Sequence, residues 1–389
     1  MTENYKDSNS QGHLHTHYDR RREETHPIVA VDLYRMKQPL KEPYHLSFAT
    51  FHSFDTFLIQ VRTEDGRTAW GEVTACQGYV PESAEDIWDF LCAHGPKVVG
   101  MSPETAIESI LPYAAHGGYP VSPLMTALEL VSRRIPSGDE PKVVPSALVP
   151  LVGLLSAEHE PELESGFWTQ IERKYTTIKV KVGFDVSLDI HRVTLIQELA
   201  RQAPGTLIRI DANQGYSFDD AREFVQKVTP EAIELFEQPF PAGDWESQVS
   251  LSRISPLPLM LDESILGTED VERTAALGCA QFVKFKLMKS GGVRLLGEQV
   301  ALAKRLGLTV VLGNGVSGEI GCHQEASAAV GLGIKTAGEM NGFLKLQTSI
   351  LRRPLISAPG GVVVDPEFQA VPDLERVPQM VVDQQSWAP

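Results

Sequence analysis

Short apolar runs that end in a charged residue recur along this 389-residue chain from Pro145 onward. The runs are β-branched or aliphatic, and segments with the apolar spacing of a helix separate them, which is typical of βα units and a parallel sheet. One charged residue ends each unit, about every 25 residues: Lys181, Asp211, Glu237, Asp262 and Lys286. This regularity predicts a closed barrel rather than an open doubly wound sheet, and no G-x-G-x-x-G motif follows the first run to indicate a dinucleotide fold.

Three carboxylates end consecutive strands of this predicted barrel. The carboxyl ends of barrel strands meet at one mouth, so we expect Asp211, Glu237 and Asp262 to converge. Any one of them could simply cap the following helix, but three together would repel one another without a cation between them. Oxygen ligands suit a hard ion, so the sequence predicts a Mg²⁺ site, with Mn²⁺ as an alternative. Zinc is disfavoured because no His or Cys belongs to the set.

Four lysines flank the carboxylates. Alternation along a strand puts Lys179 and Lys181 on one face, and likewise Lys284 and Lys286, and we expect both pairs to point into the barrel. They could merely offset the carboxylates. Four lysines and a divalent ion exceed three carboxylates in charge, however, which implies a negatively charged substrate. Near Mg²⁺ and one another the neutral amines should be favoured, as a general base near neutral pH requires.

Five motifs together resemble the muconate-cycloisomerase-like (muconate-lactonizing) subgroup of the enolase superfamily: TIKVKVG, IDANQGY, FEQP, LDES and FKLMKSGG. The resemblance implies an α/β fold, a modified (β/α)8 barrel of the (β/α)7β type with an N-terminal α+β capping domain. It implies that the three carboxylates hold Mg²⁺ and that Lys181 and Lys286 are the acid/base pair. Lys179 would tune Lys181, and Asn213 would support the metal site.

Three departures from the subgroup bear on the substrate. Ser317 stands where the seventh strand usually ends in Glu, so we expect Glu319 or Glu339 to lie beside Lys286 instead. Lys284 stands where a neutral residue, often Asn, is usual, which suggests a more anionic substrate. The segment KTAGEMNGF lacks the Asp-x-Asp that dipeptide epimerases use to hold a substrate amino group, which makes that activity less favoured.

The chain divides into four predicted segments: a disordered polar tail (1–26), an α+β capping domain (27–144), the barrel (145–355) and a C-terminal segment that returns to the cap (356–389). In the cap, Asp65-Gly66 between apolar runs predicts a hairpin. By resemblance, cap loops around His45–Phe54 and Cys76–Pro81 would close over the mouth. The predicted substrate-binding residues are Lys284, Asn213, Ser317, Phe51 and Tyr79.

Composition excludes several classes of partner. The net charge is −16 and no dense Lys/Arg tract exists, so neither nucleic acid nor a membrane is expected. The longest apolar stretch is broken by Pro145 and Pro150 and is too short to span a bilayer. Four widely spaced cysteines without a CxxC fit a reducing cytoplasm. The expected partner is a small-molecule carboxylate, and a homo-oligomer is expected.

The sequence therefore supports a Mg²⁺-dependent racemase or epimerase as the leading hypothesis. It would remove the proton α to a carboxylate through an enediolate, on an amino acid derivative, because two opposed bases are what inversion requires. A lyase, either a dehydratase or a cycloisomerase, would use the same enolate. A non-catalytic metal-binding relative is the alternative of another class, suggested by Ser317 and Lys284.

Overall fold

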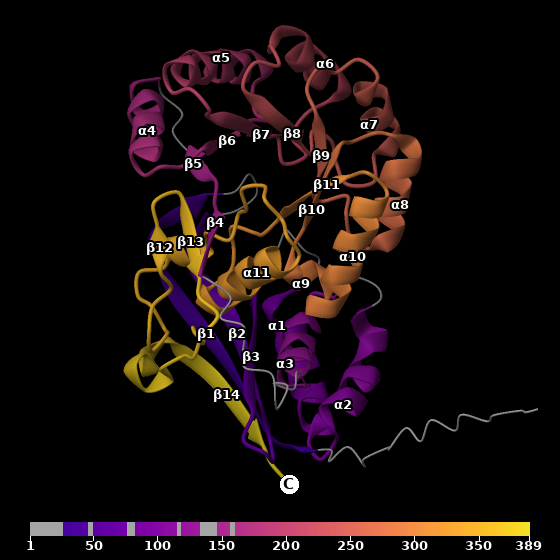
Figure 1. The fold of residues 1–389 in the computed structure, drawn as a ribbon, viewed down its shortest axis with the longest axis vertical. Helices are drawn as coiled ribbons and strands as arrows, with labels where there is room; N and C mark the ends of the chain where they lie inside the picture. Colours follow the sequence, from indigo (N-terminus) through magenta and orange to yellow (C-terminus); the bar gives the residue numbers. More distant parts are fainter. Residues whose placement is uncertain (1–25, 46–49, 76–81, 115–117, 133–145, 156–159) are drawn as a thin grey trace, which may run out of the picture.

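A computed structural model describes residues 26–45, 50–75, 82–114, 118–132, 146–155 and 160–389. Figure 1 shows two parts, a barrel surrounded by helices and a smaller cap that places a sheet and helices against the barrel. Residues 1–25 of the predicted tail and Tyr79 lie outside the described residues. No helix in the described ranges is long and apolar enough to cross a membrane.

Seven parallel strands form the barrel wall in the sequential order β11-β10-β9-β8-β7-β6-β5. Their bounds are β5 Gly153–Leu155, β6 Thr177–Lys181, β7 Leu207–Asp211, β8 Ile233–Glu237, β9 Leu259–Leu261, β10 Phe282–Phe285 and β11 Thr309–Leu312. An irregular segment at Gly338-Glu339 closes the wall. The Glu339 N–H donates to the Leu312 carbonyl at 3.0 Å, and the Gly338 N–H donates to the Pro150 carbonyl at 2.8 Å. These bonds complete the predicted (β/α)7β barrel.

Helices cover the outside of the wall because their apolar faces pack on the strands. They are α4 Glu160–Glu172, α5 Val186–Gln202, α6 Phe218–Lys227, α7 Trp245–Ser252, α8 Thr268–Leu277, α9 Leu287–Ser290, α10 Val293–Arg305 and α11 Glu319–Gly331. Three of them begin at a side-chain cap, in which Asp185, Ser217 and Asp244 accept backbone N–H groups of the first turn. These three caps fix the residue at which the preceding strand-to-helix loop ends.

The cap contains a four-stranded antiparallel sheet in the order β14-β1-β2-β3. Its strands are β1 Ile28–His45, β2 Thr50–Thr63, β3 Thr68–Ala75 and β14 Val381–Trp387, and its helices are α1 Ala84–His94, α2 Pro103–Ile110 and α3 Ser122–Ser132. The hairpin predicted at Asp65-Gly66 joins β2 to β3, and Gly66 has the positive φ of 83° that the turn requires. The last strand of the chain, β14, pairs with the first, β1.

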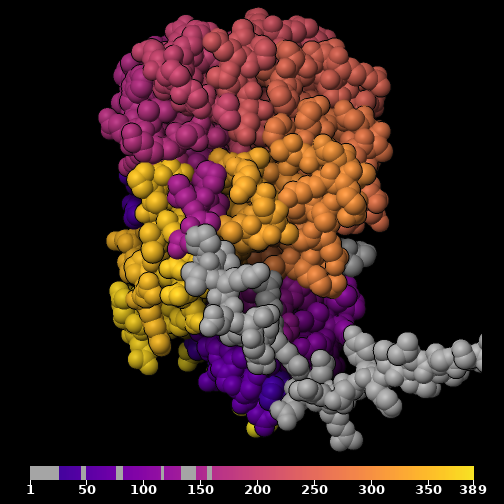
Figure 2. All heavy atoms as spheres, viewed as in Figure 1, coloured from indigo at the N-terminus to yellow at the C-terminus, as the bar shows by residue number. Residues whose placement is uncertain are grey.

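A small second sheet joins the end of the chain to the start of the barrel. It consists of β4 (Ala147–Pro150), β12 (Ser357–Ala358) and β13 (Gly361–Val364), in the order β12-β13-β4. Figure 2 shows this yellow C-terminal region beside the magenta residues that lead into the barrel. The pairing of β13 with β4 ties the two ends of the barrel together.

Gly71 of β3 marks the closest approach between the cap sheet and its helix α3. A Cβ atom at this position would overlap the carbonyl oxygen of Pro123, a backbone atom that cannot move without shifting the helix. We expect Gly71→Ala to lower the free energy of unfolding by about 1–3 kcal/mol. Gly297→Ala, within α10 and with room for a methyl group, should instead raise it by about 0.5–1 kcal/mol. Urea unfolding of both variants checks the pair, and equal effects of one sign would contradict this packing.

Candidate active site

The three predicted metal ligands lie at one edge of the sheet. Asp211 and Glu237 are the last residues of β7 and β8 and stand opposite each other in register, and Asp262 follows β9 directly. Two polar residues with positive φ, Asn213 at 41° and Gln238 at 38°, turn the chain out of β7 and β8. The Gln238 side chain accepts the Asp262 N–H at 3.0 Å. The expected convergence of the carboxylates at the mouth is confirmed.

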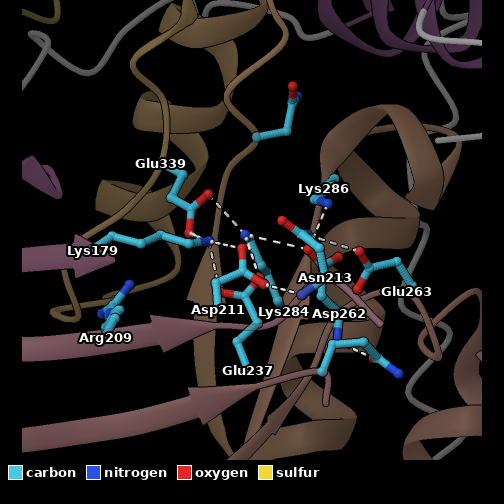
Figure 3. Close-up of polar contacts among 12 residues, drawn as sticks. Lys179, Arg209, Asp211, Asn213, Glu237, Asp262, Glu263, Lys284, Lys286 and Glu339 are labelled. Atoms are coloured by element: carbon cyan, nitrogen blue, oxygen red, sulfur yellow. Dashed lines mark hydrogen bonds and ion pairs between the residues drawn. The ribbon is translucent and has the colours of Figure 1, made fainter. Parts of the chain in front are cut away.

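Lys179 connects three carboxylates below the mouth (Figure 3). Its Nζ lies 2.9 Å from Asp211 Oδ2, 2.7 Å from Glu237 Oε2 and 2.6 Å from Glu339 Oε1. The side chain is 2% exposed. Lys179 is therefore a buried cation that donates hydrogen bonds to Glu237 and Glu339 and forms an ion pair with Asp211.

Lys181 stands at the end of β6, opposite Asp211 of β7 in register. Its Nζ donates to Asp211 Oδ2 at 2.6 Å and to the amide oxygen of Asn213. The Asn213 amide in turn donates to Glu263 at 3.1 Å, so it connects the lysine to a further acidic group. The Lys181 side chain is 33% exposed, against 2% for Lys286, so it can meet a molecule at the mouth.

Lys284 and Lys286 approach the same carboxylates from β10 and its end. Lys284 Nζ lies 3.0 Å from Glu237 Oε1, 2.8 Å from Glu339 Oε2 and 3.3 Å from Asp262 Oδ2. Lys286 Nζ donates to Asp262 Oδ2 at 2.8 Å. Both lysines are buried, and because Lys179 and Lys181 also contact the strand-end carboxylates, all four predicted lysines point into the barrel as expected.

The charge state expected for the lysines is wrong for this arrangement. Burial alone would lower their pKa values, but the negative charges near Lys181, of which Asp211 is the largest, together outweigh it and raise the pKa of Lys181. Asp211, Glu237 and Glu339 likewise raise the pKa of Lys179, and Glu237 and Glu339 raise that of Lys284. These amines are ammonium groups, because the carboxylates around each one outweigh both burial and the neighbouring lysines.

Glu339 also corrects the predicted charge balance. Three carboxylates were expected to face four lysines, but Glu339 supplies a fourth carboxylate, which lies between Lys179 and Lys284. The sequence feature that could have indicated Glu339 was the unusual Lys284, because an additional buried cation requires an additional anion. Four carboxylates thus compensate the four predicted lysines, and Lys289 lies 3.8 Å from one of them, Asp262.

The donor set suits a divalent ion in its chemistry but not in its arrangement. Carboxylate oxygens are the ligands that Mg²⁺ prefers. Here, however, Asp211 is bound by Lys179 and Lys181, and the other two predicted ligands are bridged by Lys284. In the part of the chain that the structure describes, no three or more Asp, Glu, His or Cys side chains are grouped so that they could hold a metal ion. The residues present do not fit Mg²⁺ as they stand.

Ser317 and its two predicted substitutes lie elsewhere than expected. The Ser317 hydroxyl donates to Glu72 of the cap at 3.3 Å. Glu319 accepts from Ser349 and from the Ile350 N–H, so the prediction that Glu319 or Glu339 lies beside Lys286 is wrong.

Glu325 of α11 is an acidic residue close enough to Lys286 to feel its charge, and the sequence pattern did not predict it. Its carboxylate accepts the Leu287 N–H at 2.8 Å. Burial raises the pKa of Glu325 to about 7, while the Leu287 N–H and the charge of Lys286 oppose that rise. It lies more than one helical turn beyond the expected position, so the strand pattern gave no reason to select it.

The cap reaches the barrel mouth through aromatic and acidic residues. Phe51 packs beside Leu40, Phe54, Val316 and Leu346, and it is half-buried. Tyr44 is close enough to Lys181 to affect its pKa. Glu72 accepts the N–H of Ile320 at 3.0 Å at the start of α11. These contacts place the described part of the cap against the loop after β11, where Phe51 was predicted to bind substrate.

Comparisons with known proteins, by sequence and by fold, support the predicted family. Residues 167–367 match the family described as "Enolase C-terminal domain-like". The chain is 30% identical over 349 residues to muconate cycloisomerase 1 of Pseudomonas putida, covering 81% of this chain and 87% of that protein. It is 25% identical over 333 residues to the N-succinyl-L-Arg/Lys racemase of Bacillus cereus, covering 83% and 89%.

A solved structure shares the whole fold. The dipeptide epimerase of Cytophaga hutchinsonii, complexed with Mg and the dipeptide D-Ala-L-Val, superposes with a TM-score of 0.79 at 20% identity, over 92% of this chain and 99% of that one. Divalent metal use is thus found among proteins of this fold. The barrel and its cap agree with this shared fold, and the chain belongs to the enolase superfamily of enzymes, in its muconate-cycloisomerase-like group.

Proposed function

We propose that the protein is a racemase or epimerase that moves the proton α to a carboxylate in an amino acid derivative. The observation that carries the proposal is the placement of Lys181 and Lys286 at the same edge of the barrel, on strands separated by β7, β8 and β9. A substrate between them would present one face to each amine. Inversion at a carbon requires this arrangement, since one group takes the proton and the other returns it.

The proposed step is balanced by the two lysines alone. The neutral amine of one lysine takes the α-proton, and the electrons of the C–H bond move into the carboxylate to form an enediolate. The ammonium of the other lysine then returns a proton to the opposite face. Lys181 is suited to start as the donor, because Asp211 helps to raise its pKa, and once it has given up its proton its neutral amine is the acceptor for the opposite enantiomer.

Two relatives favour an acylated amino acid as the substrate class. One is named for N-succinyl-L-Arg and -Lys, and another, 26% identical over 339 residues, is the L-Ala-D/L-Glu epimerase of Clostridium acetobutylicum. Both names describe an α-carbon between a carboxylate and an acylated nitrogen. A lyase is the second candidate, because muconate cycloisomerase shares 30% identity with the chain.

The positive charge near the substrate carboxylate has two candidate sources. Mg²⁺ or Mn²⁺ held by the three strand-end carboxylates stays a prediction from the sequence. The contacts of Lys284 favour an ammonium group in that place, so no step of the proposal is assigned to a metal ion.

Solvent exchange tests the proposed function. The protein is incubated in D₂O with N-succinyl-L-arginine, L-Ala-L-Glu and muconolactone, and α-proton loss and optical rotation are followed by NMR and polarimetry. Exchange with inversion supports a racemase or epimerase. Exchange with a new alkene or a changed lactone would replace it by the lyase, and an absence of exchange across all three substrate classes would contradict both.

A further inference from the structure

We propose that the Lys284 ammonium takes the place of a divalent cation in this site and that the protein works without one. The inference deepens the proposed function and rests on it for the reaction concerned. It concerns how the carboxylate cluster is neutralised, which can be measured on the protein without any substrate.

The first observation is the position of the Lys284 nitrogen. It contacts Glu237 and Asp262, two of the three predicted metal ligands, together with Glu339. An ammonium group has three N–H donors, and here three carboxylates from three separate elements surround it. A metal ion shared by Glu237 and Asp262 would compete for the oxygens that Lys284 already occupies.

The second observation is the charge of the whole cluster. Each of the three predicted ligands already faces at least two ammonium groups, in one connected set of ion pairs that holds five lysines and four carboxylates: Lys179, Lys181, Lys284, Lys286, Lys289, Asp211, Glu237, Asp262 and Glu339. All these groups except Lys181 and Lys289 are nearly fully buried. A divalent ion would add positive charge to a set of ion pairs in which lysines already outnumber carboxylates, and uncompensated buried charge is costly.

The third observation is that Lys284 comes with its own counter-ion. Glu339 Oε2 lies 2.8 Å from Lys284, on the irregular segment that closes the barrel, while its other oxygen binds Lys179. Glu339 is itself buried, so its carboxylate depends on these two lysines for compensation. The Lys284–Glu339 ion pair is thus part of the barrel wall. It holds the Lys284 ammonium beside the carboxylates that a metal ion would need.

Manganese binding tests the inference on the wild-type protein. Purified protein is dialysed against EDTA, and Mn²⁺ is then titrated and followed by electron paramagnetic resonance. We expect no stoichiometric binding, and no rise in melting temperature in excess Mg²⁺, because a ligand of the native state would stabilise it. One Mn²⁺ bound per chain, and lost in Asp211→Asn, would overturn the inference.

Lys284→Asn supplies the complementary measurement. Without the ammonium, Glu237 and Asp262 lose their bridging cation, so we expect Mn²⁺ affinity to increase by at least about tenfold. The matched control is Lys289→Asn, because Lys289 lies 3.8 Å from Asp262 but does not bridge the carboxylates. An equal gain in both variants would show a general charge effect and contradict the specific role of Lys284. If Lys284→Asn does not fold by circular dichroism, the wild-type titration decides.

Solvent exchange separates this inference from the proposed function. If exchange occurs equally with EDTA and with added Mg²⁺, both stand. Exchange that EDTA abolishes and Mg²⁺ restores would leave the isomerase and overturn the role of Lys284. Absence of exchange under both conditions would overturn the isomerase, while the Mn²⁺ titrations still decide how the cluster is neutralised.

Discussion

Lys181→Ala and Lys286→Ala are each expected to lower the racemisation rate by about 10²–10⁴-fold. Inversion needs a proton acceptor on one face and a donor on the other, so the loss of either amine interrupts the reaction. Lys181 is partly exposed at the mouth, whereas Lys286 is buried against Asp262 at 2.8 Å. The measurement is the change of optical rotation with the best substrate of the exchange panel.

Lys304→Ala is the control for these variants. Its Nζ is exposed and donates to the Leu332 carbonyl at 2.6 Å, outside the carboxylate cluster. We expect its racemisation rate to match the wild type. If Lys181→Ala or Lys286→Ala also retained the wild-type rate, that lysine would serve only the charge balance of the cluster.

Arg209→Ala is expected to lower the free energy of unfolding by about 3–5 kcal/mol. Arg209 is fully buried inside the barrel, two residues before Asp211 on β7. It donates to both oxygens of Glu234, at 2.7 and 3.2 Å, and to the Ala337 carbonyl at 2.7 Å. Its removal would leave Glu234 without its partner and would open space beside the segment that closes the barrel.

Arg201→Ala tests whether burial is the cause. Arg201 also donates twice to one glutamate, Glu231, at 3.0 and 2.8 Å, but both side chains are about half exposed at 51% and 52%. Water screens such a pair, so we expect little measurable change in its urea midpoint. Similar losses of unfolding free energy in the two variants would show that burial of Arg209 does not strengthen its ion pair.

Strand ends were the part of the site that the sequence could predict. Parallel strands alternate with helices, so an apolar run followed by a charged residue marks both an element and its functional end. Lys181, Asp211 and Glu237 lie where this rule expects them, in register on neighbouring strands. Asp262 and Lys286 follow the next two strands at the same edge.

Glu339 could not be placed in the same way. It lies in an irregular segment with no apolar run before it, and hydrogen bonds to Pro150 and Leu312 bring that segment into the wall. Those bonds depend on closure of the whole barrel. The charge state of Lys284 was mispredicted for the same reason. Alternation along a strand gives the direction of a side chain but not its partner, here Glu339.

Contacts between the cap and the barrel could not be predicted from the sequence for a related reason. Glu72 on β3 accepts N–H groups at the start of α11, although the two positions are far apart in the chain. A pattern within one strand cannot show which loop of another domain it will meet. The role of Ser317 therefore became visible in the assembled structure, where its hydroxyl faces Glu72.

Enantiomer-specific exchange in the two lysine variants tests the central claim, that Lys181 and Lys286 serve opposite faces of one substrate. Each variant is incubated in D₂O with each pure enantiomer of the best substrate, and the loss of the α-proton signal is followed by NMR. We predict that Lys181→Ala exchanges the α-proton of one enantiomer through Lys286 and that Lys286→Ala exchanges that of the other. If one variant exchanged neither enantiomer while the other exchanged both, a single base would carry out the chemistry and the two-lysine account would be wrong.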